Sequence, residues 1–281
     1  TMNGDYSITA NFAIDTHTLT VTAGEGGTIT APATSPSTHD YGAVVTITAV
    51  PNTGYHFVNW TGDVATVTDV NAASTTITMN GDYSITANFA IDTHTISGTV
   101  QADSAGLSGV IIDYGNGTVV TGTGTWSDGY YEFTVEYGWT GTITPTLTGY
   151  TFDPVLYDYT ETPVTENLTA QDFTAYINIT DVSITGTARY GETLTAVVVP
   201  SGATVTYRWL VADSETDTYL PITGAAESTF NISSGYVGKY IKVEAAGTGT
   251  YTGTVTSDPV NISPRPLTVT ADPKSKIYGQ F

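Results

Sequence analysis

TMNGDYSITANFAIDTHT, the stretch from Thr1 to Thr18, recurs letter for letter from Thr78 to Thr95. A period of about 77 residues indicates tandem modules, in which each unit packs its own small core and neighbouring units stack. In the second copy the repeated stretch closes a module. Residues 1–18 are therefore predicted to be the last strand of a preceding repeat, and the chain is expected to be a segment of a longer protein.

The repeated stretch also predicts its own conformation. Tyr83, Ile85, Ala87 and Phe89 alternate with polar residues at period two, which is typical of a strand with one buried face. Asn80-Gly81 before them predicts a hairpin turn. The chain as a whole is rich in Thr, Gly and Tyr, a composition that favours strands and turns. We predict an all-β chain, an elongated tandem array of small β-sandwich or β-grasp-like modules.

Charge and cysteine content exclude several classes of protein. No Lys or Arg precedes Arg189, whereas nineteen of the 27 acidic residues do, so the first 188 residues carry almost all of the net charge of −20. Nucleic-acid binding needs clustered basic side chains and is excluded on this ground. The chain has no cysteine, which excludes a disulfide framework and a thiol nucleophile. It also has no apolar run of eighteen residues, so no membrane insertion is predicted within this segment.

Residues 19–95 are predicted to form the first complete module. The order LTVTAGEGGTIT, then YGAVVTITAVPNTGYHFVNWTGD, then TITMNGDYSITANFA resembles the divergent internalin B-type repeat of bacterial surface proteins, over about residues 19–92. This resemblance implies a small β-rich module, β-grasp-like with one helix in some members. The stretch from Gly62 to Thr76 is rich in Thr and Val, which disfavours that helix here.

Residues 96–175 are predicted to form a second module. ISGTVQADSAGLSGVIIDYGNG, then SDGYYEFTVEYGWTGTITPTLTGYTFDP, then QDFTA resembles the carboxypeptidase-regulatory-like or transthyretin-like β-sandwich of exported bacterial proteins. The strand that carries Tyr131, Phe133, Val135 and Tyr137 on one face supports this comparison. The resemblance implies an accessory domain and no peptidase activity.

Residues 176–263 resemble a bacterial immunoglobulin-like domain, on ITGTARYGETLTAVV, VTYRWLVAD and VGKYIKVEAAGTGTYTGTVTS. The resemblance implies that Trp209 is the core tryptophan of a β-sandwich. Lys242 stands where antibody domains place their second cysteine, so we expect Ile241 and Val243 to face the core instead. After them, PLTVTA and KSKIYGQ in residues 264–281 resemble the start of an adhesin-type repeat and predict the first strand of a further module.

Candidate sites are few. Asp213, Glu215 and Asp217 alternate in one loop, a spacing consistent either with three carboxylates around a calcium ion or with a solvated hairpin tip. No other cofactor is indicated. His17 and His94 occupy the same joint position in the two copies, which favours packing over metal binding. Four aromatic residues of the second module form either a sugar-stacking platform or ordinary core: Trp126, Tyr130, Trp139 and Tyr157.

No catalytic motif appears, because the chain contains no nucleophile elbow, phosphate-binding loop or dinucleotide fingerprint. We therefore expect a non-enzymatic structural or adhesive segment of a secreted or cell-surface prokaryotic protein, such as a stalk, adhesin, surface layer or filament. Its expected partners are the neighbouring modules of the same chain, other copies through strand pairing, and glycans. The alternative is an accessory carbohydrate-binding region of a secreted polysaccharide-degrading enzyme.

Overall fold

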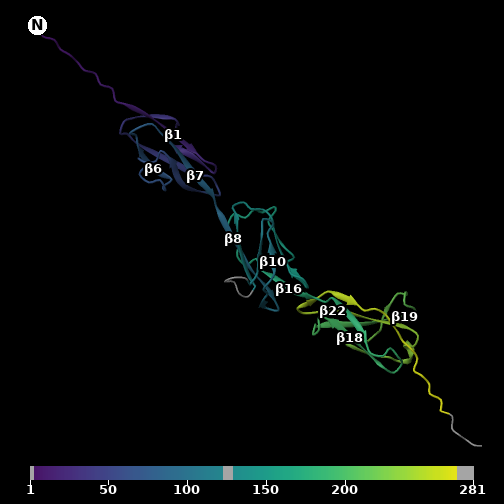
Figure 1. Cartoon of the computed structure of the whole chain (residues 1–281). Coiled ribbons are helices and arrows are strands. Elements are labelled where there is room, and N and C mark those ends of the chain that lie inside the picture. The colour runs from purple at the N-terminus through teal and green to yellow at the C-terminus, as the bar shows by residue number, and fades with distance from the viewer. Residues whose placement is uncertain (1–2, 123–128, 271–281) are drawn as a thin grey trace, which may run out of the picture. The chain divides into compact units, whose positions relative to one another are not determined.

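The computed structural model describes residues 3–122 and 129–270 (Figure 1). Strands account for nearly all of its regular structure, as predicted. The single helical element in the described part is a short 3-10 turn, η1 (Ser234–Tyr236). None of the described segments forms a helix of the length and apolarity that a membrane span requires.

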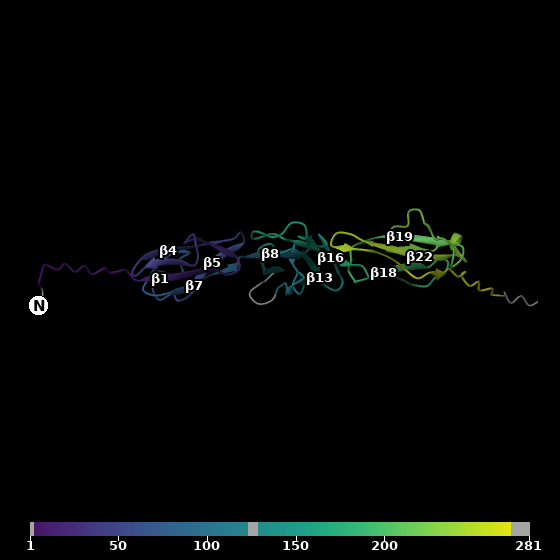
Figure 2. The ribbon, with the colours of Figure 1, turned by 90° about the horizontal axis from the view of Figure 1, so that it is seen from above.

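The first group of strands contains the second copy of the repeated sequence. It comprises β1 (Thr16–Ala23), β2 (Gly27–Ala31), β3 (Ser37–Asp40), β4 (Val44–Pro51), β5 (Tyr55–Gly62), β6 (Ser74–Thr78) and β7 (Tyr83–Ile91). One sheet has the order β3-β1-β7-β5, with β1 and β7 parallel at its centre. The other sheet has the order β2-β4-β6. Side chains from both sheets build one core, and the labels β1, β4, β5 and β7 in Figure 2 mark strands of the two layers. Ile47, Trp60, Ile77 and Ile85 are fully or almost fully buried in it.

The hairpin predicted at Asn80-Gly81 is wrong. The strand before it, β6, pairs with β4, whereas the strand after it, β7, pairs with β1 and β5. Residues 79–82 therefore carry the chain from one sheet to the other. The turn dipeptide indicates a change of direction correctly, but which strands then pair is decided by the burial of both sheets around one core.

The second group of strands also forms two sheets. It comprises β8 (Thr93–Ala102), β9 (Ala105–Gly106), β10 (Ile111–Asp113), β11 (Thr118–Val120), β12 (Tyr130–Glu136), β13 (Thr142–Thr146), β14 (Tyr150–Asp153), β15 (Tyr157–Asp158) and β16 (Phe173–Asn178). The sheets have the orders β11-β10-β13-β15 and β12-β8-β16-β14. Tyr131, Phe133 and Val135 of β12 alternate inward and are buried, as their spacing predicts.

The third group contains the remaining strands. It comprises β17 (Asp181–Thr185), β18 (Thr193–Val199), β19 (Val205–Ala212), β20 (Leu220–Pro221), β21 (Thr229–Asn231), β22 (Tyr240–Gly247), β23 (Tyr251–Thr252), β24 (Thr254–Thr256) and β25 (Val260–Asn261). The sheets have the orders β17-β18-β21 and β20-β19-β22-β24. Trp209 is fully buried, stacks on Phe230 at 5.2 Å and donates from Nε1 to the carbonyl of Glu227. Ile241 and Val243 are fully buried as expected.

Two compact units are distinguishable in the chain. One contains Thr1–Ser97, Glu132–Thr142 and Asp158–Gln171, and the other contains Gly98–Tyr131, Ile143–Tyr157 and Asp172–Phe281. The point where the first group of strands meets the second lies inside the first unit. The pairing of β16 with β23, between the second and third groups, lies inside the second.

Candidate functional site: the joint at Asp92 and the Asp213 loop

A single residue, Asp92, separates the first group of strands from the second. β7 ends one residue before it and β8 begins one residue after it. The Asp92 N–H donates to the carbonyl of Gly54 at 2.8 Å, and the Asp92 carbonyl accepts from the N–H of Tyr137 at 2.8 Å. Because the N–H of Asp92 is hydrogen-bonded to the first group of strands and its carbonyl to the second, the backbone has little freedom at this point.

Side chains reinforce this joint. The Asp92 carboxylate lies 2.8 Å from Nδ1 of His56, an exposed pair of small energetic value. The Tyr137 ring lies 5.9 Å from the ring of His94 and packs directly against the backbone of Gly54, where an added Cβ would overlap the ring. Gly54 has a φ of +80°, so both its backbone conformation and the contact require glycine. Apolar packing and backbone hydrogen bonds therefore hold the joint.

The sequence identifies one half of this joint and misses the other. The prediction that His17 and His94 occupy equivalent joint positions agrees with their packing against Tyr41 and Tyr137. The two tyrosines were not predicted as joint residues. Each is followed by a glycine, but Tyr-Gly also occurs at 114–115, 190–191 and 278–279, so this dipeptide alone could not have identified them.

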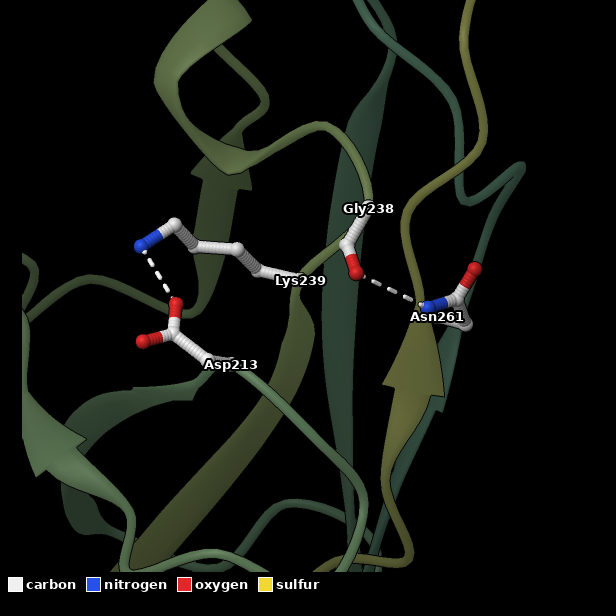
Figure 3. A network of polar contacts seen from close by, with 4 residues as sticks. All are labelled: Asp213, Gly238, Lys239 and Asn261. Atoms are coloured by element: carbon white, nitrogen blue, oxygen red, sulfur yellow. Dashed lines mark hydrogen bonds and ion pairs between the residues drawn. The ribbon is translucent and has the colours of Figure 1, made fainter.

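The three acidic residues of the predicted calcium site lie in the loop after β19, and the structure places them in different surroundings. The Asp213 carboxylate accepts from Nζ of Lys239 at 2.8 Å (Figure 3). Asp213 and Asp217 line a shallow pocket of about 200 Å³ together with Lys239, whereas Glu215 does not. Within residues 3–122 and 129–270, no three acidic or histidine side chains come together as a metal-binding group.

Two neighbouring contacts complete the loop. The backbone carbonyl of Glu215 accepts from the Tyr219 hydroxyl at 3.3 Å, and Nζ of Lys242 lies 4.4 Å from the centre of the Tyr219 ring. Burial, together with the nearby charge of Glu215, raises the pKa of Tyr219 above its ordinary value. Gly238, next to Lys239, accepts a hydrogen bond from Asn261 and so ties this region to β25 (Figure 3). A calcium ion at Asp213, Glu215 and Asp217 stays a prediction; an unchanged thermal midpoint after chelation would dismiss it.

Two of the four aromatic residues of the predicted sugar platform, Trp139 and Tyr157, are engaged in packing within the second group, and Tyr130 is half-buried. Trp126 lies outside the described residues. Trp139 is only 8% exposed and packs against Tyr159 at 6.1 Å, and Tyr157 packs edge-on against Phe173 while its hydroxyl donates to the carbonyl of Asp172. Rings used in this way are not free to stack on a sugar.

A pocket of about 450 Å³ on the second group also lacks catalytic groups. Tyr150 is the one ionisable side chain among the residues that line it: Gly109, Ile111, Pro145, Thr146, Leu147, Thr148, Tyr150 and Phe152. Its other polar side chains are the hydroxyls of Thr146 and Thr148, and the lining contains no histidine, carboxylate, lysine or cysteine to act as a general base or as an activated nucleophile.

The comparison with protein families matches the first group of strands. Residues 17–93 match the divergent InlB B-repeat domain family. We call these residues the B-repeat. They include all seven strands from β1 to β7, apart from the first residue of β1, and they end in the joint described above.

Three solved structures that match the chain do so at low sequence identity. The Bacillus anthracis TIE protein is 8% identical with a TM-score of 0.36, and the match covers 89% of this chain and 49% of that one. Titin domains A168–A170 are 10% identical with a TM-score of 0.22, covering 80% and 94%. A DUF3823 family protein from Bacteroides uniformis ATCC 8492 is 16% identical with a TM-score of 0.21, covering 62% and 100%. The chain thus spans about half of the TIE protein structure. No curated protein sequence matches the chain.

Proposed function

We propose that this chain is a non-catalytic structural or adhesive segment of a secreted or cell-surface prokaryotic protein. The observation that carries the proposal is the joint at Asp92, where one residue is hydrogen-bonded to a turn of the first group of strands and to a turn of the second. A single hydrogen-bonded residue at this point does not behave as a flexible random-coil linker. A chain that has to hold a distal activity away from a surface benefits from joints that resist bending.

Two further observations support this role. Residues 17–93 match a family whose internalin-type members occur in bacterial surface proteins, and the first 188 residues contain no basic side chain. A uniformly acidic array repels neighbouring copies and so limits lateral aggregation of exposed strands. The second function considered, carbohydrate binding, is less favoured because two of its four candidate rings are engaged in packing: Trp139 is buried and Tyr157 packs edge-on against Phe173.

Small-angle scattering on the full chain tests the structural role. A compact chain of this length would have a radius of gyration of roughly 19 Å, whereas modules arranged end to end would give about 30 Å or more. We expect the larger value, and the smaller one would contradict a stalk. Proteolytic shaving of intact producer cells tests the location separately, since peptides of this chain should be released without cell lysis. Polysaccharide pull-down of the purified chain tests the carbohydrate alternative, and we expect no retention.

A further inference from the structure

The first and second copies of the joint sequence dock in the same way. The carbonyl of Asp15 accepts from the N–H of Tyr41 at 2.8 Å, as that of Asp92 does from Tyr137. The ring of His17 lies 6.0 Å from that of Tyr41 at 56°, compared with 5.9 Å and 51° for the second pair. Identical joint sequences thus make identical contacts on two groups of strands with different sequences.

The receiving surfaces are also built alike. The N–H of Gly42, next to Tyr41, donates to the carbonyl of Met79, and the N–H of Gly138 donates to that of Val164, both at 2.7 Å. Three residues after each of these carbonyls lies an acceptor side chain. Oδ1 of Asp82 accepts from the N–H of Thr18 at 2.7 Å.

In the second joint the same place is taken by Asn167, whose Oδ1 accepts from the N–H of Thr95 at 2.9 Å. We call three parts together the socket: the Tyr-Gly turn, the residue whose carbonyl accepts from the glycine N–H, and this acceptor side chain. The first socket is Tyr41, Gly42, Met79 and Asp82, and the second is Tyr137, Gly138, Val164 and Asn167. The recurrence of four contacts on unlike sequences indicates that the socket is a specific receiver of the Asp-Thr-His-Thr joint.

The two sockets differ in one respect. Tyr137 of the second socket is half-buried because the B-repeat covers it with the turn at Gly54. Tyr41 of the first socket is 58% exposed, and Asp15 beside it is exposed as well. The segment that leads into the first socket, residues 3–14, has the same sequence as residues 80–91, which close the B-repeat.

We infer that Tyr41 and Asp15 form a docking surface for a second B-repeat of the same kind. Its turn equivalent to Gly54 would cover the Tyr41 ring, and its histidine equivalent to His56 would pair with the Asp15 carboxylate. Residues 3–14 would serve as its last strand. This inference concerns how repeats join and holds whether or not the chain functions at a cell surface.

An extended chain provides the test. A second copy of residues 1–77 placed ahead of Thr1 creates a complete additional repeat, because residues 1–18 of the original chain then stand in the place of 78–95. Tyr41→Phe in the added copy leaves one Tyr41, the one expected to be covered. Nitration by tetranitromethane, followed by mass mapping of peptic peptides, measures how accessible that ring is. Tyr41 in the unextended 281-residue chain is the exposed reference, and Tyr137 is the covered reference.

We expect nitration of the covered Tyr41 to fall about tenfold relative to the original chain, which corresponds to a tenfold excess of docked over undocked repeats. A rate equal to that of the original chain would overturn the inference. Protection of Tyr41 in the original chain that increases with protein concentration would overturn it too, because a separate copy of the chain would then occupy the surface with its own last strand, and residues 3–14 would have no part in the docking. Protection by an added polysaccharide alone would assign the surface to a glycan instead.

A matched pair of glycine variants in the added copy separates docking from folding. Gly54→Ala places a Cβ where the tyrosine ring packs, whereas Gly42→Ala places one where no atom lies within 4 Å. Both glycines have nearly the same φ, +80° and +79°, so the backbone strain is matched. We expect Gly54→Ala alone to restore nitration of Tyr41. Restoration by both variants, or by neither, would contradict docking through this turn.

Discussion

At the scale of single residues, buried tryptophans fill the cores of the first and third groups of strands. Trp209 is the clearest example, because it is fully buried, stacks on Phe230 and satisfies its indole N–H with the carbonyl of Glu227. The sequence predicts this burial from the alternation in β19 and from the resemblance to immunoglobulin-like domains. Trp60 has the corresponding role in the B-repeat, where Nε1 donates to the carbonyl of Ala72.

Replacement of Trp209 by alanine should lower the free energy of unfolding of the third group by about 3–5 kcal/mol, because a large cavity remains in a small core. Hydrogen exchange in urea, followed peptide by peptide, measures this locally. Peptides from β17 to β25 should lose protection at lower urea, while those of the B-repeat should not change. Trp209→Phe keeps the stacking on Phe230 and should cost less. Equal loss in both groups would contradict independent cores.

Tyr157 predicts a pH effect at high pH. Burial, with a contribution from the charge of Asp172, raises the pKa of its hydroxyl above the ordinary value of 10.0. A raised pKa in the folded state means that the folded chain holds this proton more tightly than the unfolded chain does. The stabilisation is therefore fully present below pH 10 and is lost as the pH rises through the folded-state pKa. Tyr157→Phe should weaken the decline in stability above pH 10, and a decline identical to that of the original chain would contradict the assignment.

Whole elements show how one sequence can take two environments. Residues 83–91 form β7 at the centre of a sheet, parallel to β1 and antiparallel to β5. Residues 6–14 have the same letters, yet Ile8 and Phe12 are 93% and 94% exposed. In Figure 1 the trace ahead of β1 carries no arrow. Alternation predicts a strand in both places, but only the copy that follows a complete set of partner strands is paired.

Matched substitutions in the two copies measure this difference. Ile85 is fully buried, so Ile85→Ala should lower the free energy of unfolding of the B-repeat by about 2–5 kcal/mol. Ile8→Ala, at the same place in the same sequence, should change it by less than about 0.5 kcal/mol. Urea denaturation followed by hydrogen exchange of β1 and β5 peptides compares the two variants. A large effect of Ile8→Ala would show that residues 6–14 are paired in solution.

At the scale of the whole molecule, basic residues are distributed unevenly along the chain. All seven basic residues lie at or beyond Arg189, and they include the two basic partners of the Asp213 and Glu244 ion pairs, Lys239 and Arg208. The first and second groups of strands therefore contain no lysine–carboxylate or arginine–carboxylate pair. Their stability rests on burial and hydrogen bonds, which salt screens only weakly.

Trypsin should accordingly leave one large fragment that begins at Thr1 and ends at Arg189, because no cleavage site precedes that residue. The fragment should survive digestion in denaturant as well as in buffer, since its resistance is covalent. Intact mass spectrometry after digestion checks this. Glu-specific protease is the control, and it should cut the same region once the chain is unfolded. Tryptic products from within residues 1–188 would contradict the prediction.

The sequence by itself determined the properties that depend on neighbouring residues. Period-two alternation placed Tyr131, Phe133, Ile241 and Val243 on buried faces, because adjacent side chains of a strand point to opposite sides. The letter-for-letter echo identified the joint and its equivalent histidines.

Only the tertiary structure decided which distant residues meet. The spacing of residues along the chain does not say which distant residues lie nearby. Alternation therefore suggested one site for Asp213, Glu215 and Asp217, although Asp213 pairs with Lys239 in the structure. For the same reason the socket was missed. Tyr137 meets Asp92 and Gly54 because β12 pairs with β8 immediately after the B-repeat ends, and burial across the sheets selects that pairing.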